Sequence, residues 1–165
     1  MTETCFIPDA AQARAFRDTL GCFATGVTIV TIQSDHGPMG FTANSFASLS
    51  IEPPLVLWSP ARSSSRFVQY AAAQHYAIHV LAQDQADLIA RFIRGGPGFE
   101  GMSYHRNAEG VPLIEGSLAR FECEQHATHE GGDHLIVVGR VLRCAKRDGA
   151  PLVFTQGQYG GFAAM

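Results

Sequence analysis

The stretch GFTANSFASLSIEPPLVLWSP, residues Gly40 to Pro60, places a run of small polar side chains directly before an apolar run. A half-buried strand alternates apolar and polar residues, and a surface loop usually carries charge, whereas Glu52 is the only charged residue here. A pair of prolines opens the apolar run, where a strand tolerates missing N–H groups. We therefore expect two strands, 40–50 and 53–60, with a polar wall before the second that contacts a large, partly uncharged ligand.

Strand patterns continue on both sides of this stretch. The segment 26–35 is β-branched and alternating, and a turn at 36–40 returns the chain so that this strand pairs with the strand 40–50. The remaining strand patterns are 75–83, a long hairpin over 117–148 with its tip near 130–133, and a final strand and tail at 150–162.

Three short helices are expected between the strands. The first has Asp9 as its cap and Gln12 at the capping-box position, and it ends at Gly21 or Gly26. Its apolar face comprises Ala13, Phe16 and Leu20. The second helix covers 63–73 and begins with a serine cap. The third has Asp84 as cap, an apolar face of Leu88, Ile89 and Phe92, and a stop at Gly95.

The order of elements predicts a mainly β fold with some α+β character. Many strands, tight turns and few short helices are typical of an antiparallel barrel with helices packed outside, here in a single domain over residues 1–165. The chain is 46% hydrophobic and only 16% charged, so an ordered core is expected. The low charge leaves a monomer few polar residues to cover its surface, which favours a homodimer.

Composition excludes several classes of protein. The net charge is −3 and there is no long basic run, which argues against a nucleic-acid partner. No apolar stretch is long enough to predict a membrane span, and MTETCFIPDAAQARAF lacks the pattern of a signal peptide, so we expect a cytoplasmic protein. The cysteines are far apart and form no CxxC pair, which favours reduced thiols over a zinc site or a disulfide framework. They are Cys5, Cys22, Cys123 and Cys144.

The familiar nucleotide and metal motifs are missing. Gly95-Gly96-Pro97-Gly98 follows a helix and so reads as a helix stop rather than a dinucleotide fingerprint. His75 and His79 are four apart on a predicted strand, which would separate them by about 13 Å, too far to share one metal. His126 and His129 would point to opposite faces of a regular strand. We therefore expect no metal site.

Two polar features remain as candidates for ligand binding. Hydroxyls and an amide at the end of the strand 40–50 supply the mixed donors and acceptors that an isoalloxazine edge requires. The segment SPARSSSR, 59–66, places three serines at a helix start between Arg62 and Arg66, a pattern typical of a phosphate site, although a plain cap and solvated loop is the alternative. His134 follows a Gly-Gly-Asp turn and either faces a cleft or is a surface or cross-strand histidine.

Four segments, in this order, resemble the short-chain flavin reductases, the small components of two-component flavin-dependent monooxygenases. They are FRDTLGCFATGVTIVTI, GFTANSFASLSIEPPLVLWSP, GGDHLIVVGRVL and PLVFTQGQYGGF. The likeness covers nearly the whole chain. It implies an FMN-binding split barrel with flanking helices, assembled as a homodimer, with FMN or FAD in a groove near the dimer interface.

The resemblance also implies roles for individual residues. The TANSF segment would lie against the isoalloxazine, and the next polar residues would face the ribityl chain and phosphate. His134 would lie near the nicotinamide, with Tyr159 in the same pocket, and Phe92 would approach the flavin. The implied catalytic residues are His134 and Asn44, and the implied cofactor-binding residues are Thr42, Ala43, Asn44, Ser45, Ser48, Ser59, Ser63, Ser64, Arg66, Phe92, His134 and Tyr159.

The implied activity is hydride transfer from NADH or NADPH to flavin, with the flavin carrying the chemistry and the protein supplying orientation. Reduced flavin would then diffuse to a separate monooxygenase. Two alternatives stay open: a reductase that keeps its flavin and passes electrons to ferric iron or a corrinoid, and a flavin-binding protein without turnover. The sequence does not distinguish FMN from FAD or NADH from NADPH.

Overall fold

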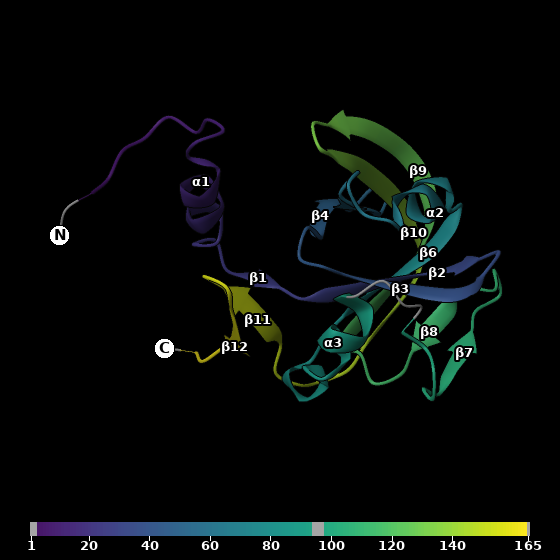
Figure 1. Ribbon diagram of the computed structural model, residues 1–165. Coiled ribbons are helices and arrows are strands. Elements are labelled where there is room, and N and C mark those ends of the chain that lie inside the picture. Colours follow the sequence, from purple (N-terminus) through teal and green to yellow (C-terminus); the bar gives the residue numbers. More distant parts are fainter. Residues whose placement is uncertain (1–2, 94–97, 165) are drawn as a thin grey trace.

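The computed structural model describes residues 3–93 and 98–164. Its centre is a seven-stranded antiparallel sheet in the order β3-β2-β6-β9-β10-β5-β4, which curls into the open barrel of Figure 1. Among the described residues no backbone pairing joins the two edge strands, so the barrel is not closed. The strands are β2 Thr28–Ser34, β3 Gly37–Ala43, β4 Ala47–Ser50, β5 Leu55–Trp58, β6 His75–Val80, β9 Ala119–Gly131 and β10 His134–Lys146.

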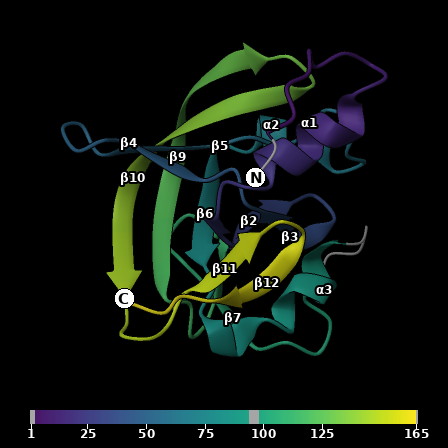
Figure 2. The same cartoon turned by 90° about the vertical axis from the view of Figure 1, so that its left-hand side faces the viewer.

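Two smaller sheets complete the β structure. The first has the order β1-β11-β12 and stands beside the barrel, with β11 and β12 facing the viewer in Figure 2. The second is the hairpin β7–β8. The bounds are β1 Thr25–Gly26, β7 Tyr104–Arg106, β8 Pro112–Ile114, β11 Leu152–Thr155 and β12 Gln158–Gly161. The predicted mainly β, antiparallel architecture is confirmed.

The helices are short, as expected, but their positions differ from the prediction. They are α1 Ala13–Leu20, α2 Phe67–Ala72, a 3-10 helix Gln83–Gln85 and α3 Leu88–Ile93. The predicted Asp9 cap of the first helix is displaced: Gln12 N donates to Asp9 Oδ1 at 2.9 Å in the turn before α1, whereas the N-cap of α1 is Gln12 and has no side-chain cap hydrogen bond. The second helix begins four residues later than predicted, because the serine segment forms turns. The predicted stop at Gly95 lies outside the described residues.

The strand predicted over 40–50 is two strands. It breaks after Ala43: β3 pairs with β2, whereas β4 pairs with β5 on the opposite edge of the sheet. Residues Asn44–Phe46 carry the chain from one edge to the other. The predicted turn at 36–40 is also shorter, because β3 already begins at Gly37.

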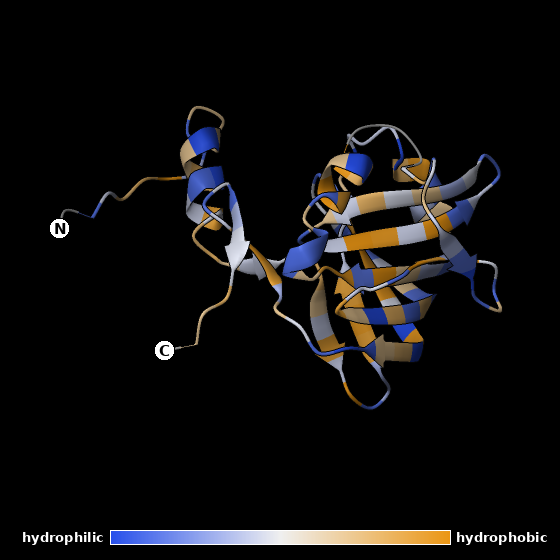
Figure 3. Ribbon diagram, turned by 90° about the horizontal axis from the view of Figure 1, so that it is seen from below, coloured by the Kyte–Doolittle hydropathy of each residue, from blue (hydrophilic) through white to orange (hydrophobic). Residues whose placement is uncertain are grey.

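The core fills the barrel and its lower end. One buried cluster lies inside the curled sheet around Trp58, Tyr70 and Tyr76, and a second lies under α3 around Phe92 and Leu152. The barrel strands are banded in Figure 3 because apolar residues that face the core alternate with polar ones. By contrast, α1 stands away from the barrel (Figures 1 and 3) and buries none of its residues.

His79 on β6 joins the central sheet to the β7–β8 hairpin. Its ring is fully buried, Nδ1 lies 3.1 Å from Ile29 O, and Ile114 N donates to Nε2 at 3.1 Å. An imidazole with one acceptor and one donor partner is neutral and carries its proton on Nδ1. Burial lowers the pKa of His79 from 6.5 to about 4, although the hydrogen bond to Ile29 acts in the opposite direction.

This histidine predicts acid sensitivity of the fold. Because the unfolded chain takes up the proton at higher pH than the folded one, the free energy of unfolding should fall as pH drops from 6.5 to about 4. The loss is on the order of 3 kcal/mol. Urea unfolding across this pH range measures it. His79→Gln should be less stable at neutral pH but have a flatter pH dependence, whereas the exposed control His36→Gln should keep the wild-type slope. An unchanged slope in His79→Gln would contradict this account.

Candidate functional site

A small cavity of about 180 Å³ lies where the end of β3 meets the β11–β12 hairpin. We call it the β3 pocket. It brings together residues that are far apart in the sequence, among them three consecutive predicted site residues and the predicted Tyr159. Its lining comprises Val27, Thr42, Ala43, Asn44, Ile93, Phe154 and Tyr159.

The polar wall of the β3 pocket is held by neighbouring elements. Thr28 Oγ1 donates to Ala43 O at 2.7 Å, and Thr42 Oγ1 lies 3.5 Å from Ile89 O on α3. Asn44 follows the last residue of β3 and is exposed. Its amide therefore sits at the mouth of the pocket, where it can offer both a donor and an acceptor to a ligand.

The opposite wall is aromatic. Tyr159 on β12 packs against Phe154 on β11 with ring centroids 4.9 Å apart, and 47% of Tyr159 remains exposed. Sequence reasoning selected Tyr159 but missed Phe154, Val27 and Ile93. These three are apolar residues in ordinary strand or helix patterns, and only the fold brings them beside β3.

Ser45 connects this wall to the predicted phosphate segment, which we call the serine loop, Ser59–Arg66. Ser59 N donates to Ser45 Oγ at 2.9 Å, and Ser45 Oγ lies 3.3 Å from Ser59 O. The Ser45 hydroxyl thus connects two segments that the strands β4 and β5 separate in sequence. Ser48, on the edge strand β4, is exposed.

Within the serine loop the hydroxyls differ in availability. Ser64 Oγ accepts a hydrogen bond from Arg66 N at 3.2 Å and so serves the turn before α2. Ser63 is exposed. The serine loop therefore combines a local turn with at least one hydroxyl that faces outward.

His134 lies against the serine loop. Its backbone forms a β-bridge with Ala61, and the flanking bonds Arg62 N to Asp133 O (2.9 Å) and Leu135 N to Pro60 O (3.1 Å) dock the hairpin tip. The side chain is 43% exposed, and its Nδ1 lies 2.7 Å from Asp133 Oδ1. The hydrogen bond to His134 lowers the pKa of the Asp133 carboxyl.

Two predicted cofactor contacts are placed differently by the structure. Arg66 is 8% exposed, and its guanidinium donates to the carbonyl oxygens of Gly40, Phe92 and Ile93. Phe92 has no exposed surface and packs edge-to-face on Phe99 with centroids 5.2 Å apart. Phe92 thus belongs to the buried core in this structure, and its predicted approach to the flavin stays a prediction.

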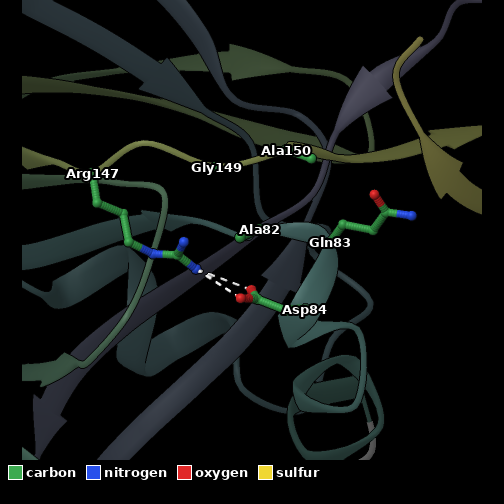
Figure 4. Close-up of a pocket in the computed structure, with 6 residues that line it drawn as sticks. All are labelled: Ala82, Gln83, Asp84, Arg147, Gly149 and Ala150. Carbon is green, nitrogen blue, oxygen red and sulfur yellow. Dashed lines mark hydrogen bonds and ion pairs between the residues drawn. The ribbon is translucent and has the colours of Figure 1, made fainter.

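A second cavity, of about 340 Å³, is drawn in Figure 4. Arg147 Nη2 lies 2.9 Å from Asp84 Oδ1 across it, and the same guanidinium donates to Gly116 O and Asp148 O. Its charged groups are thus paired within the protein, and it contains none of the predicted site residues. The lining comprises Ala82, Gln83, Asp84, Arg147, Gly149 and Ala150.

A larger groove of about 650 Å³ lies between α1 and the β11–β12 turn and shares Phe154 with the β3 pocket. Sequence reasoning did not anticipate it. Its lining comprises Arg17, Asp18, Gly21, Cys22, Phe154, Gln156 and Gly157. Together the β3 pocket and this groove offer space on the scale of small-molecule sites.

Within residues 3–93 and 98–164, no group of three or more His, Cys, Asp or Glu side chains could hold a metal ion. His126 and His129 are exposed on β9, and His79 is engaged by backbone groups. Nor is any helix in this part of the chain long and apolar enough to cross a membrane.

Comparison with known proteins places the chain. Residues 20–163 match the family model described as "Flavin reductase like domain". The chain is 55% identical over 161 residues to "FMN reductase (NADH) SmoA" of Agrobacterium fabrum, an alignment that covers 98% of this chain and 92% of the relative. It is 41% identical over 155 residues to "Flavin-dependent monooxygenase, reductase subunit HsaB" of Rhodococcus jostii, over 93% and 80% of the two chains.

Solved structures agree with this placement. The NADH:FAD oxidoreductase SgcE6 of Streptomyces globisporus superposes with a TM-score of 0.89 at 33% identity, over 97% of this chain and 98% of that one. Nitrilotriacetate monooxygenase component B from Mycobacterium thermoresistibile superposes with a TM-score of 0.87 at 39% identity, over 93% and 88%. The match over most of the length confirms the resemblance drawn from the sequence motifs. The chain belongs to the family of flavin reductase like domain proteins.

Proposed function

We propose that this protein is an NAD(P)H:flavin oxidoreductase that reduces FMN or FAD and supplies free reduced flavin to a partner monooxygenase. The observation that carries the proposal is the β3 pocket, where Thr42, Ala43 and Asn44 face an exposed tyrosine ring. Family membership supports the reaction, and the printed names of the relatives, an FMN reductase using NADH and a monooxygenase reductase subunit, support the partner.

The residues of the pocket fit a flavin. An isoalloxazine has a flat apolar face and a polar edge with donors and acceptors, and the pocket pairs an aromatic wall with a wall of hydroxyl, amide and backbone groups. In this proposal Thr42, Ala43, Asn44 and Ser45 hold the ring, while Ser48, Ser59, Ser63 and Ser64 lie toward the ribityl chain and phosphate.

The bound flavin would supply the hydride-accepting chemistry, and the protein would orient the two substrates and stabilise charge. Asn44 and nearby backbone N–H groups would stabilise negative charge on the polar edge of the ring. Because Asp133 engages Nδ1 of His134, the nitrogen left for the nicotinamide substrate is Nε2. His134 pairs with Ala61 of the serine loop, and Ser59 of the same loop is hydrogen-bonded to Ser45. These contacts would fix the position of the histidine relative to Ser45.

Oxidation of NADH and of NADPH, followed by absorbance with varied FMN, FAD or riboflavin, tests the proposal. Saturable oxidation that depends on added flavin is the expected result, and the ratios of kcat/KM would identify the preferred pair. A protein that retains flavin and reduces it once without turning over added flavin would instead support electron transfer to another acceptor. Binding without any NAD(P)H oxidation would indicate a flavin-binding protein only.

His134→Ala should raise the KM for the nicotinamide substrate about tenfold, because it removes one hydrogen-bonding contact, and should raise the KM for flavin much less. Asn44→Ala should show the reverse, with weaker flavin binding or slower turnover. Steady-state kinetics with each substrate varied in turn measure both effects. Unchanged constants in His134→Ala would remove the role assigned to this residue.

We also propose that the protein is a homodimer in which the partner covers α1 and the residues after it up to Phe23, which we call the N-terminal arm. Phe16 and Leu20 on α1 are 44% and 59% exposed, and Phe23 is 78% exposed. Within the described part of the chain none of the α1 residues is buried, and an exposed apolar helix face is typical of a surface that another subunit buries. The cytoplasmic location, and the exclusion of nucleic acid and membrane as partners, stay predictions.

Leu20→Asp should weaken this dimer, because it places a charge in the buried part of the interface. Light scattering over a range of protein concentrations measures the change. The control Val68→Asp alters a side chain that is 72% exposed on α2, outside the arm, and should stay dimeric. A monomeric wild-type protein, or a Leu20→Asp variant as dimeric as the wild type, would contradict the assignment of the arm.

A further inference from the structure

Arg66 is a buried cation that serves carbonyl groups rather than a carboxylate. Its Nη1 donates to Gly40 O at 2.6 Å and to Phe92 O at 3.0 Å, and Nη2 donates to Ile93 O at 3.3 Å. Its Cζ lies 4.6 Å from the centroid of the Phe41 ring. Among the described residues no acidic side chain forms an ion pair with it.

The acceptors explain why an arginine is needed. Phe92 and Ile93 are the last described residues of α3, whereas Gly40 lies on β3. Only a planar guanidinium presents several donors in a fixed fork, so one side chain can reach α3 and β3 together.

These contacts join β3 to α3, two of the elements that line the β3 pocket. Ile93, whose carbonyl Arg66 binds, lines the pocket from α3. Gly40, the other acceptor, lies on β3 two residues before Thr42 of the polar wall. The elements approach closely, since a Cβ on Gly40 would lie 2.2 Å from Phe92 Cδ1.

Arg66 is itself the last residue of the serine loop, where its backbone N–H donates to Ser64 Oγ. Arg66 is not among the residues that line the β3 pocket, but it contacts β3, α3 and the serine turn before α2. A change in its side chain would alter the spacing of β3 and α3 without removing any group that faces the ligand.

We propose that Arg66 is a positioning residue that fixes the separation of β3 and α3 and thereby sets the affinity of the β3 pocket for the flavin ring. The inference rests on the proposed function. It differs from a direct phosphate contact, because a positioning role affects every ligand that carries the isoalloxazine, whereas a phosphate contact affects only flavins that carry a phosphate.

Equilibrium binding of FMN and of riboflavin, which lacks the phosphate, separates these roles. Quenching of flavin fluorescence, measured without NAD(P)H, gives the Kd of each ligand for the wild type, Arg66→Met and Arg66→Lys. Arg66→Met should weaken both ligands by about tenfold, because three carbonyl groups lose their donor and α3 shifts. Arg66→Lys should fall between the two, since an ammonium is a point donor and not a fork.

The matched control is Arg120→Met. Arg120 is a partly buried arginine on β9 whose Nε binds Glu122 Oε1 at 3.1 Å, and it lines no part of the pocket. It should lower thermal stability while leaving both Kd values unchanged. If Arg66→Met does not fold, the comparison rests on Arg66→Lys.

Three results would overturn the inference. Weaker binding of FMN alone would make Arg66 a phosphate ligand. Unchanged Kd values with lower thermal stability, as in Arg120→Met, would make it a residue of the fold only. Parallel losses in Arg120→Met would show that any lost arginine perturbs the pocket. If instead the wild type binds neither flavin, it is the proposed function that fails.

Discussion

The long β9–β10 hairpin is the constraint on which the rest of the structure depends. Its strands are thirteen residues long and pair at twelve positions, β9 continues the sheet to β6, and β10 continues it to β5. Two register shifts bend it around the core, and at the first of them Gly139 is required because a Cβ there would lie 2.1 Å from the Tyr76 hydroxyl oxygen. Its tip binds the backbone of Pro60 and Arg62, which delivers His134 to the serine loop.

The site follows from this arrangement because each of its parts is fixed by a neighbour. The hairpin tip holds the serine loop, Ser59 of that loop bonds to Ser45, and Ser45 follows the polar wall that ends β3. Arg66 ties the same strand to α3 from behind. The contacts are mostly backbone to backbone or side chain to backbone, so the position of the site depends on the fold more than on any single pair of side chains.

Much of this could be predicted from sequence. The β2–β3 pairing and the β9–β10 hairpin with its tip arise from local sequence patterns. The resemblance predicts Tyr159 beside His134, whereas the structure places it in the β3 pocket with Thr42, Ala43 and Asn44. The break at Asn44–Phe46 could not be predicted, because the alternation of apolar and polar residues is the same whether one strand continues or the chain crosses to the other edge of the sheet. The β7–β8 hairpin has only three residues per strand, too few for a period. The carbonyl partners of Arg66 could not be predicted, because an arginine beside serines has the same sequence pattern whether it binds a phosphate or buried carbonyl groups.

The placement of Arg66 bears on how flavin is held. The guanidinium of Arg66 is engaged by carbonyl groups, and within residues 3–93 and 98–164 the side chains that line the β3 pocket are neutral. Charge-assisted hydrogen bonds are roughly twice as strong as neutral ones, so a pocket built from hydroxyl, amide and aromatic groups binds its ligand less tightly than one with a cationic clamp. A reductase that hands reduced flavin to another protein needs such release. Neutral contacts to the ring are therefore compatible with the exchangeable flavin of the proposed function, in which the phosphate lies outside the β3 pocket, toward the serine loop.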